Sequence, residues 1–158
     1  MRRIILILFT MLCSCIYAQE GLHINKLFEG KIVPQEKMVE TRIRGKAISK
    51  YKLSYFHSLR FQADEHIKSE IDELYRQDSI YAQSKRTRIT DGFVSSALDQ
   101  MKYSCKDKTT IYTRMLVLPP RKGLRCYLCY KMINDTMTVI YMEGTVSSLE
   151  ELRKIFKE

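Results

Sequence analysis

The feature that most limits the fold is a pair of β-forming segments that meet at a two-residue turn. Residues 125–133 and 136–143 are rich in aromatic, aliphatic and methionine side chains, and Asn134-Asp135 between them tolerates positive φ angles. A turn at these two residues fixes the register of a hairpin. That register predicts three cross-strand pairs: Met132 with Met137, Tyr130 with Val139, and Leu128 with Tyr141. One side of the hairpin is therefore densely apolar and has to be buried.

Three further segments have the pattern of strands. Residues 37–44 and 53–61 alternate in side-chain character, as half-buried strands do. The predicted inward face of the second segment carries Leu53, Tyr55, His57, Leu59 and Phe61. Residues 110–118 are rich in β-forming residues and are expected to end at Pro119-Pro120. Together with the hairpin, these segments make about five strands.

The helices follow from apolar residues at helical spacing. This spacing predicts a short helix over residues 24–29 and a long one over 64–82. A closing helix follows the capping box at Ser147 and Ser148. Residues 89–108 are ambiguous, and a helix is favoured there over a strand. The chain is therefore predicted to be α+β, with a mainly antiparallel sheet of about five strands and helices packed on one face.

The N-terminus has the layout of a secretory signal. Met1-Arg2-Arg3 precedes a short apolar stretch and a polar boundary. The apolar stretch is shorter than the about 20 residues that a membrane-spanning helix needs. We expect cleavage after Ala18, which divides the chain into a signal peptide, residues 1–18, and a single domain, residues 19–158. The alternative is a lipoprotein signal in which Cys15 is lipidated, and only this alternative would tether the domain to a membrane.

Export and a basic charge together limit the partners. The chain has a net charge of +9, which falls to about +7 without residues 1–18. Nucleic acid is not expected as a partner outside the cytoplasm, whereas an envelope protein, a lipid or an anionic glycan is compatible with a basic domain. Five cations form a candidate patch for an anionic partner: Arg42, Arg44, Lys85, Arg86 and Arg88. The alternative is that such charges are scattered and only keep the domain soluble. The expected location is the periplasm, the cell surface or outer membrane, or the medium.

Cys126 and Cys129 form a Cys-x-x-Cys motif, which in other contexts marks a redox centre. Such a centre needs a cysteine at a helix N-terminus, where the pKa of the thiol is lowered. Here the motif lies within a predicted strand, so the two side chains point to opposite faces. A disulfide from Cys105 to either of them and three free thiols are equally compatible with the sequence. No metal site and no cofactor is predicted.

No catalytic motif is present, so a non-enzymatic binding domain is the first hypothesis. A hydrolase that uses His57 or His66 is the second, because these residues would approach each other if residues 53–61 pack against the long helix. A structural envelope component is the third. A deep polar pocket that holds a histidine beside an acid would favour the enzyme. A flat, exposed sheet face that is basic or aromatic would favour binding.

Several segments carry a resemblance to known proteins. They are the signal ending at Ala18-Gln19, residues 24–30 (INKLFEG), residues 140–145 (IYMEGT) and residues 149–152 (LEEL). In these segments and in the order of its elements, the chain resembles small exported proteins of unknown function from Bacteroidota, including gut commensals. The resemblance implies a location in the cell envelope and an α+β fold. It carries over no catalytic residue.

Overall fold

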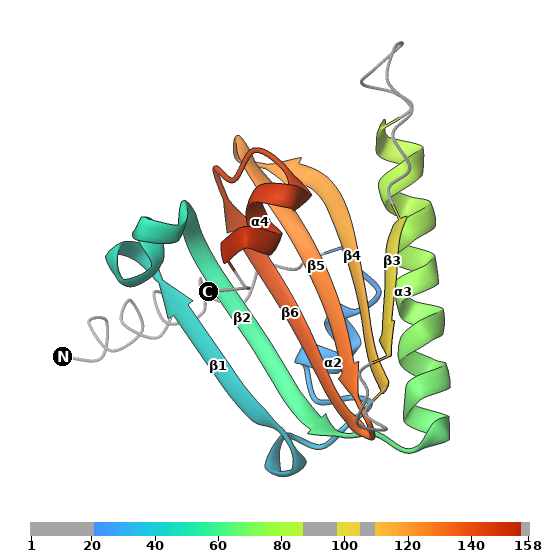
Figure 1. Cartoon of the computed structure of the whole chain (residues 1–158). Coiled ribbons are helices and arrows are strands. Elements are labelled where there is room, and N and C mark those ends of the chain that lie inside the picture. Colours follow the sequence, from blue (N-terminus) through green and yellow to red (C-terminus); the bar gives the residue numbers. More distant parts are fainter. Residues whose placement is uncertain (1–20, 87–97, 105–109, 156–158) are drawn as a thin grey trace, which may run out of the picture.

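The computed structural model describes residues 21–86, 98–104 and 110–155, and its centre is a six-stranded antiparallel sheet (Figure 1). The strands are β1 (Val39–Arg44), β2 (Leu53–Gln62), β3 (Leu98–Ser104), β4 (Thr110–Arg121), β5 (Leu124–Ile133) and β6 (Thr136–Gly144). They lie in the order β1-β2-β6-β5-β4-β3. The helices are α2 (Asn25–Phe28), η3 (Gln35–Lys37), η4 (Gly45–Tyr51), α3 (Glu65–Arg86) and α4 (Leu149–Ile155). The predicted α+β class is confirmed.

The hairpin of β5 and β6 has the register predicted from its turn. Asn134 adopts a φ of 53°, the left-handed conformation that the turn requires. The three predicted pairs, Met132 with Met137, Tyr130 with Val139 and Leu128 with Tyr141, are all formed. β6 then pairs with β2 on its other side, which places the first two strands beside the last two.

One face of the sheet, called the helix face here, packs against α2 and α3. It carries Tyr55, His57, Leu59, Leu128 and Val139, which are all buried. Figure 1 shows α2 behind the sheet, and α3 lies against β4. Their apolar residues join the same core, among them Leu27 and Phe28 of α2 and Ile71 and Leu74 of α3. Full burial of a side chain of this size contributes about 1.5–3 kcal/mol, so this face supplies much of the stability.

The opposite face is covered at one end by α4 and η4. Leu152 of α4 and Ile48 of η4 are buried in a second core with Tyr127, Cys129 and Met142 of the sheet. The helices thus lie on both faces, and not on one as the sequence pattern suggested. The reason is that the outward positions of β5 and β6 at this end are themselves large and apolar and need cover.

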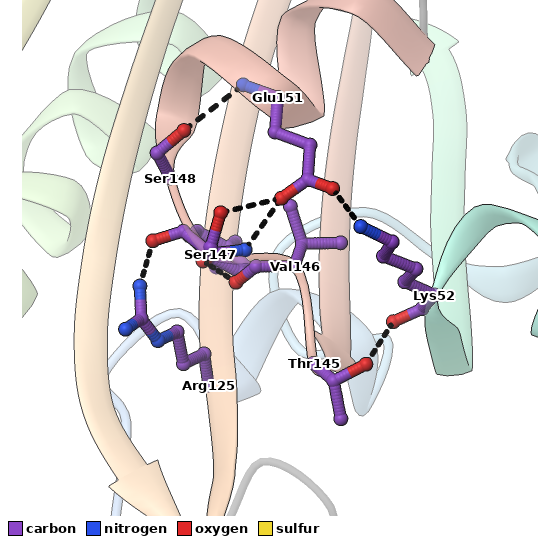
Figure 2. Close-up of polar contacts among 8 residues, drawn as sticks. Lys52, Arg125, Thr145, Val146, Ser147, Ser148 and Glu151 are labelled. Carbon is purple, nitrogen blue, oxygen red and sulfur yellow. Dashed lines mark hydrogen bonds and ion pairs between the residues drawn. The ribbon is translucent and has the colours of Figure 1, made fainter.

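A network of polar contacts fixes the start of α4 (Figure 2). One carboxylate oxygen of Glu151 accepts hydrogen bonds from the backbone N–H and the hydroxyl of Ser147, both at 2.7 Å. The other oxygen pairs with the Lys52 ammonium at 2.5 Å, and the Ser148 hydroxyl accepts the Glu151 N–H. Arg125 donates to the Ser147 carbonyl. The Ser148 cap of the predicted capping box is therefore present, but the Glu151 carboxylate accepts the N–H of Ser147 and not that of Ser148. The network also ties α4 to β5 and to the residue between η4 and β2.

Three segments differ from the sequence prediction. β1, predicted as a half-buried strand over residues 37–44, begins at Val39 and is exposed at five of its six positions, because it lies at the edge of the sheet. Leu98–Ser104 form a strand where a helix was favoured, because this segment pairs along its whole length with β4. Tertiary pairing overrides weak local preference in such edge strands. β4 also continues to Arg121, past Pro119 and Pro120. Its register shifts between Leu118 and Arg121, and such an irregular site is where a strand tolerates residues without an N–H.

Candidate functional site

The part of the second face that α4 and η4 leave uncovered is mostly polar, with Val39 and Ile133 as its exposed large apolar residues. We call it the open face and define it by eight residues of five neighbouring strands: Thr41, Ser58, Arg60, Gln62, Thr113, Lys131, Thr136 and Thr138. Each has an exposed or half-buried side chain. Figure 1 shows the strands that carry them, running below α4. Five of the eight are threonine or serine, so the surface presents a regular array of hydroxyl groups.

A row of alternating cations and hydroxyls crosses the open face. Arg60 of β2 lies opposite Thr138 of β6, Thr138 lies opposite Lys131 of β5, and Lys131 lies opposite Thr113 of β4. Since neighbouring strands are about 4.8 Å apart, the two cations stand roughly 10 Å apart with a hydroxyl between them. Their side chains project from the same side of a rigid sheet.

No described residue neutralises the charges of Arg60 and Lys131. Neither has an ion-pair partner among the described residues. The stretches of β2, β5 and β6 in the open face carry no carboxylate. Some cations elsewhere are paired, as Lys68 is with Asp135 at 3.0 Å and Arg114 with Asp72 at 3.1 Å. The open face therefore keeps two positive charges available to a ligand, with hydroxyl donors between and beside them.

The cations of the predicted anionic-partner patch that the structure describes do not come together. Arg42 and Arg44 lie on β1, at one edge of the sheet. Lys85 and Arg86 end α3, which packs over β4 on the other half of the sheet, and Arg88 lies outside the described residues. Arg42 is also paired with Glu40, and Arg44 lies over the ring of Tyr55 at 4.5 Å.

The tyrosines do not form an exposed aromatic face in the part of the chain where their side chains are described. Tyr55, Tyr127, Tyr130 and Tyr141 are buried and close the two cores. Their hydroxyls reach partners at the rim where the structure gives one: Tyr127 donates to the Val146 carbonyl at 2.7 Å, and Tyr141 donates to Glu143 at 2.8 Å. This is the usual role of tyrosine at the border of a core.

His57 is the centre of a second polar cluster, on the helix face. It is 3% exposed, and the ring of Phe28 covers it at a centroid distance of 4.5 Å. Its Nε2 lies 2.6 Å from a carboxylate oxygen of Glu40. Arg42 donates from Nε to the same carboxylate oxygen at 2.6 Å, and its Nη2 is 2.5 Å from it. One oxygen of the Glu40 carboxylate thus contacts both the His57 imidazole and the Arg42 guanidinium.

The protonation states in this cluster follow from burial and from these contacts. Burial lowers the pKa of His57 more than the hydrogen bond to Glu40 raises it. Burial raises the pKa of Glu40, but the hydrogen bonds from His57 and Arg42 together outweigh it, so its pKa is lowered. At neutral pH a neutral imidazole therefore donates its Nε2–H to an ionised Glu40. Arg42 Nε, 3.2 Å from the same nitrogen, then donates to the carboxylate rather than to the imidazole.

This cluster links β1 to β2, and its role is structural. A general base has to reach the proton that it removes from a substrate, whereas His57 is buried beneath α2. His66, the other histidine of the hydrolase hypothesis, is exposed on the first turn of α3 and does not share this cluster. No group of three or more histidine, cysteine, aspartate or glutamate side chains in the described residues is placed to hold a metal ion.

The two strand cysteines lie on opposite faces, as the alternation of β5 predicts. Cys126 is buried in the core of the helix face and Cys129 in the core beneath α4. Both thiols are free. Burial raises the pKa of Cys126, and it raises that of Cys129 to about 12, so neither has the reactive thiolate of a redox centre. Cys105 and Cys15 lie outside the described residues.

The residues of the cation row were not singled out by sequence reasoning. Arg60 precedes Phe61, a residue of the predicted inward face. Lys131 and Thr138 lie on the polar side of a hairpin whose apolar side was predicted to be buried. The pairing of Lys131 with Thr138 follows from the predicted turn. Arg60 joins the cation row only through the pairing of β2 with β6, and no local sequence pattern predicts that pairing.

The chain is significantly similar to a known protein family. Residues 11–108 and 99–156 match the model of a family described as a family of unknown function (DUF6108). The chain belongs to this family. No curated protein and no solved structure matches it significantly. Among the described residues, no helix combines the length and the apolar character that crossing a bilayer requires.

Proposed function

We propose that this DUF6108 chain is an exported, non-enzymatic binding domain and that its open face binds an anionic glycan. The observation that carries the proposal is the row of Arg60, Thr138, Lys131 and Thr113 across four neighbouring strands. Export is supported by the charged and apolar N-terminus of the sequence. The non-enzymatic part is supported by the burial of His57 against Phe28.

The shape and chemistry of the open face favour a glycan over a lipid surface. Guanidinium and ammonium groups pair with carboxylate or sulfate groups, and hydroxyls exchange hydrogen bonds with the hydroxyls of sugar rings. A membrane surface would require a contiguous apolar patch that enters the bilayer interface. The exposed large apolar residues of the described chain form no contiguous patch: Val39 lies opposite Arg60 and Ile133 opposite Thr136, on strands that are not neighbours, and Ile80 lies on α3.

A binding assay with charged and uncharged polysaccharides tests the proposal. The protein is titrated with heparin and with polygalacturonate as anionic probes and with dextran as the uncharged control, at low and at raised sodium chloride. We expect the anionic probes to bind, with an affinity that falls as salt increases, and dextran to bind weakly or not at all. The double variant Arg60→Gln, Lys131→Gln should lose about 30-fold in affinity, if each exposed contact contributes about 1 kcal/mol.

A matched control separates the open face from charge alone. The double variant Lys26→Gln, Lys37→Gln removes the same charge from exposed positions of α2 and η3. It should bind like the unmodified protein. Equal losses in the two double variants would refute a site on the open face. Binding to anionic lipid vesicles in the absence of any binding to the anionic polysaccharides would refute a glycan as the partner.

A further inference from the structure

Within the described part of the chain, β1 presents an unpartnered edge of the sheet. Among the described residues β1 pairs only with β2, and Figure 1 shows it as the outermost strand. Its side chains are exposed at five of six positions, and Val39 is 67% exposed. An edge strand offers a row of backbone N–H and C=O groups to another strand, and proteins usually cover or block such an edge.

The sequence of β1 is complementary to itself when two copies run antiparallel. With a twofold axis at Thr41, each Thr41 faces the partner's Thr41. Val39 faces the partner's Ile43, and Glu40 faces the partner's Arg42. Apolar residues thus meet on the side of the open face, and opposite charges meet on the helix face. Both kinds of cross-strand pair stabilise an antiparallel ladder.

The neighbouring registers lack this complementarity. An axis at Glu40 places two carboxylates opposite each other, an axis at Arg42 places two guanidinium groups opposite each other, and an axis at Ile43 opposes Arg42 to the partner's Arg44. Like charges directly opposite destabilise a strand pair. A pairing shifted by one residue, with Thr41 opposite the partner's Arg42, would join the helix face of one copy to the open face of the other.

We propose that β1 binds β1 of a second copy of this chain in the Thr41 register, which joins two six-stranded sheets into one. The axis stands perpendicular to the sheet, so the helix faces of the two copies adjoin and their open faces form one surface. Ser58 and Thr41 of one copy then continue into Thr41 and Ser58 of the partner subunit. This inference rests on β1 alone and does not depend on what the open face binds.

Sedimentation velocity over a range of protein concentrations tests the association. We expect a reversible dimer. Thr41→Arg places two cations at the axis and should raise the dissociation constant by about fivefold or more. Gln62→Arg is the matched control, because it adds the same charge at an exposed position of the open face away from β1. It should leave the dimer intact.

Cysteine crosslinking tests the register and works without a charge change. In Thr41→Cys the two new thiols lie directly opposite each other, within the Cα separation that a disulfide spans. In Val39→Cys they are four residues apart along the strands and should not bond. We expect Thr41→Cys to form a covalent dimer under mild oxidation and Val39→Cys to remain uncrosslinked, as in the parent protein. A monomer at all concentrations, equal effects of Thr41→Arg and Gln62→Arg, or equal crosslinking at both positions would overturn the proposal.

Discussion

Asp78 is a buried carboxylate of α3 that holds the start of α2, and its removal is expected to loosen this helix. Asp78 is 0% exposed. Its two oxygens accept the backbone N–H groups of His23, at 2.6 Å, and of Ile24, at 2.9 Å. These N–H groups belong to the two residues that precede α2, with Ile24 as its N-cap, and the start of a helix offers them no acceptor. The side chain of one helix thus caps the other across more than 50 residues of chain.

The cost of Asp78→Ala follows from the two donors that it leaves without an acceptor. A buried donor without a partner costs about 1–3 kcal/mol. Burial raises the pKa of Asp78 despite the two backbone hydrogen bonds, so the carboxylate itself has a desolvation cost that the substitution removes. We therefore expect a net loss of about 2–4 kcal/mol, below the sum of two full penalties.

Urea denaturation measures this loss, and hydrogen exchange locates it. Asp64→Ala is the matched control, since Asp64 caps α3 at an exposed position by accepting the Ile67 N–H at 2.8 Å. Loss of such a cap costs about 1 kcal/mol. In Asp78→Ala the amides of His23 and Ile24 should also exchange faster than the rest of the core. A smaller loss for Asp78→Ala than for Asp64→Ala, or unchanged exchange at these two amides, would refute the reasoning.

Three further predictions concern the α4 junction and the N-terminus. Gly144→Ala should lower stability by about 2–3 kcal/mol in chemical denaturation, because a Cβ at this position would overlap the backbone carbonyl of Lys52. Hydrogen bonds from Lys52 and Ser147 lower the pKa of Glu151 to about 2. The stability that Glu151 contributes should therefore be complete above about pH 4.3 and be lost as the pH falls towards 2, and Glu151→Gln should abolish this part of the pH dependence. Mass spectrometry of the protein from an envelope fraction should find Gln19 as the first residue, whereas a lipidated Cys15 would support the alternative signal and an intact Met1 would contradict export.

Local patterns predicted the elements that their own residues determine. The Asn134-Asp135 turn fixed the pairing of Leu128 with Tyr141 because a two-residue turn leaves one register. The alternation of β2 identified its buried face because one face of the strand is covered along its whole length. Ser148 caps α4 as its spacing from Glu151 predicted.

Long-range contacts decided what the sequence left open. Leu98–Ser104 became a strand through pairing with β4, a partner that local propensity does not reveal. α4 took the face opposite to α3 because the side chains that need cover at that end, such as Met142, are identified only by the strand order. The same limit applies to the candidate site, since Arg60 and Lys131 lie far apart in the chain and meet only through β6.

The open face as a binding surface is tested most directly by mapping a glycan on the protein. Backbone amide chemical shifts are recorded by NMR while an anionic oligosaccharide is added. We expect the shift changes to gather at residues 58–62 of β2, 131–133 of β5 and 136–140 of β6, and to vanish in the double variant Arg60→Gln, Lys131→Gln. Changes that gather on α2 and α3, or the same map in the double variant, would contradict the account.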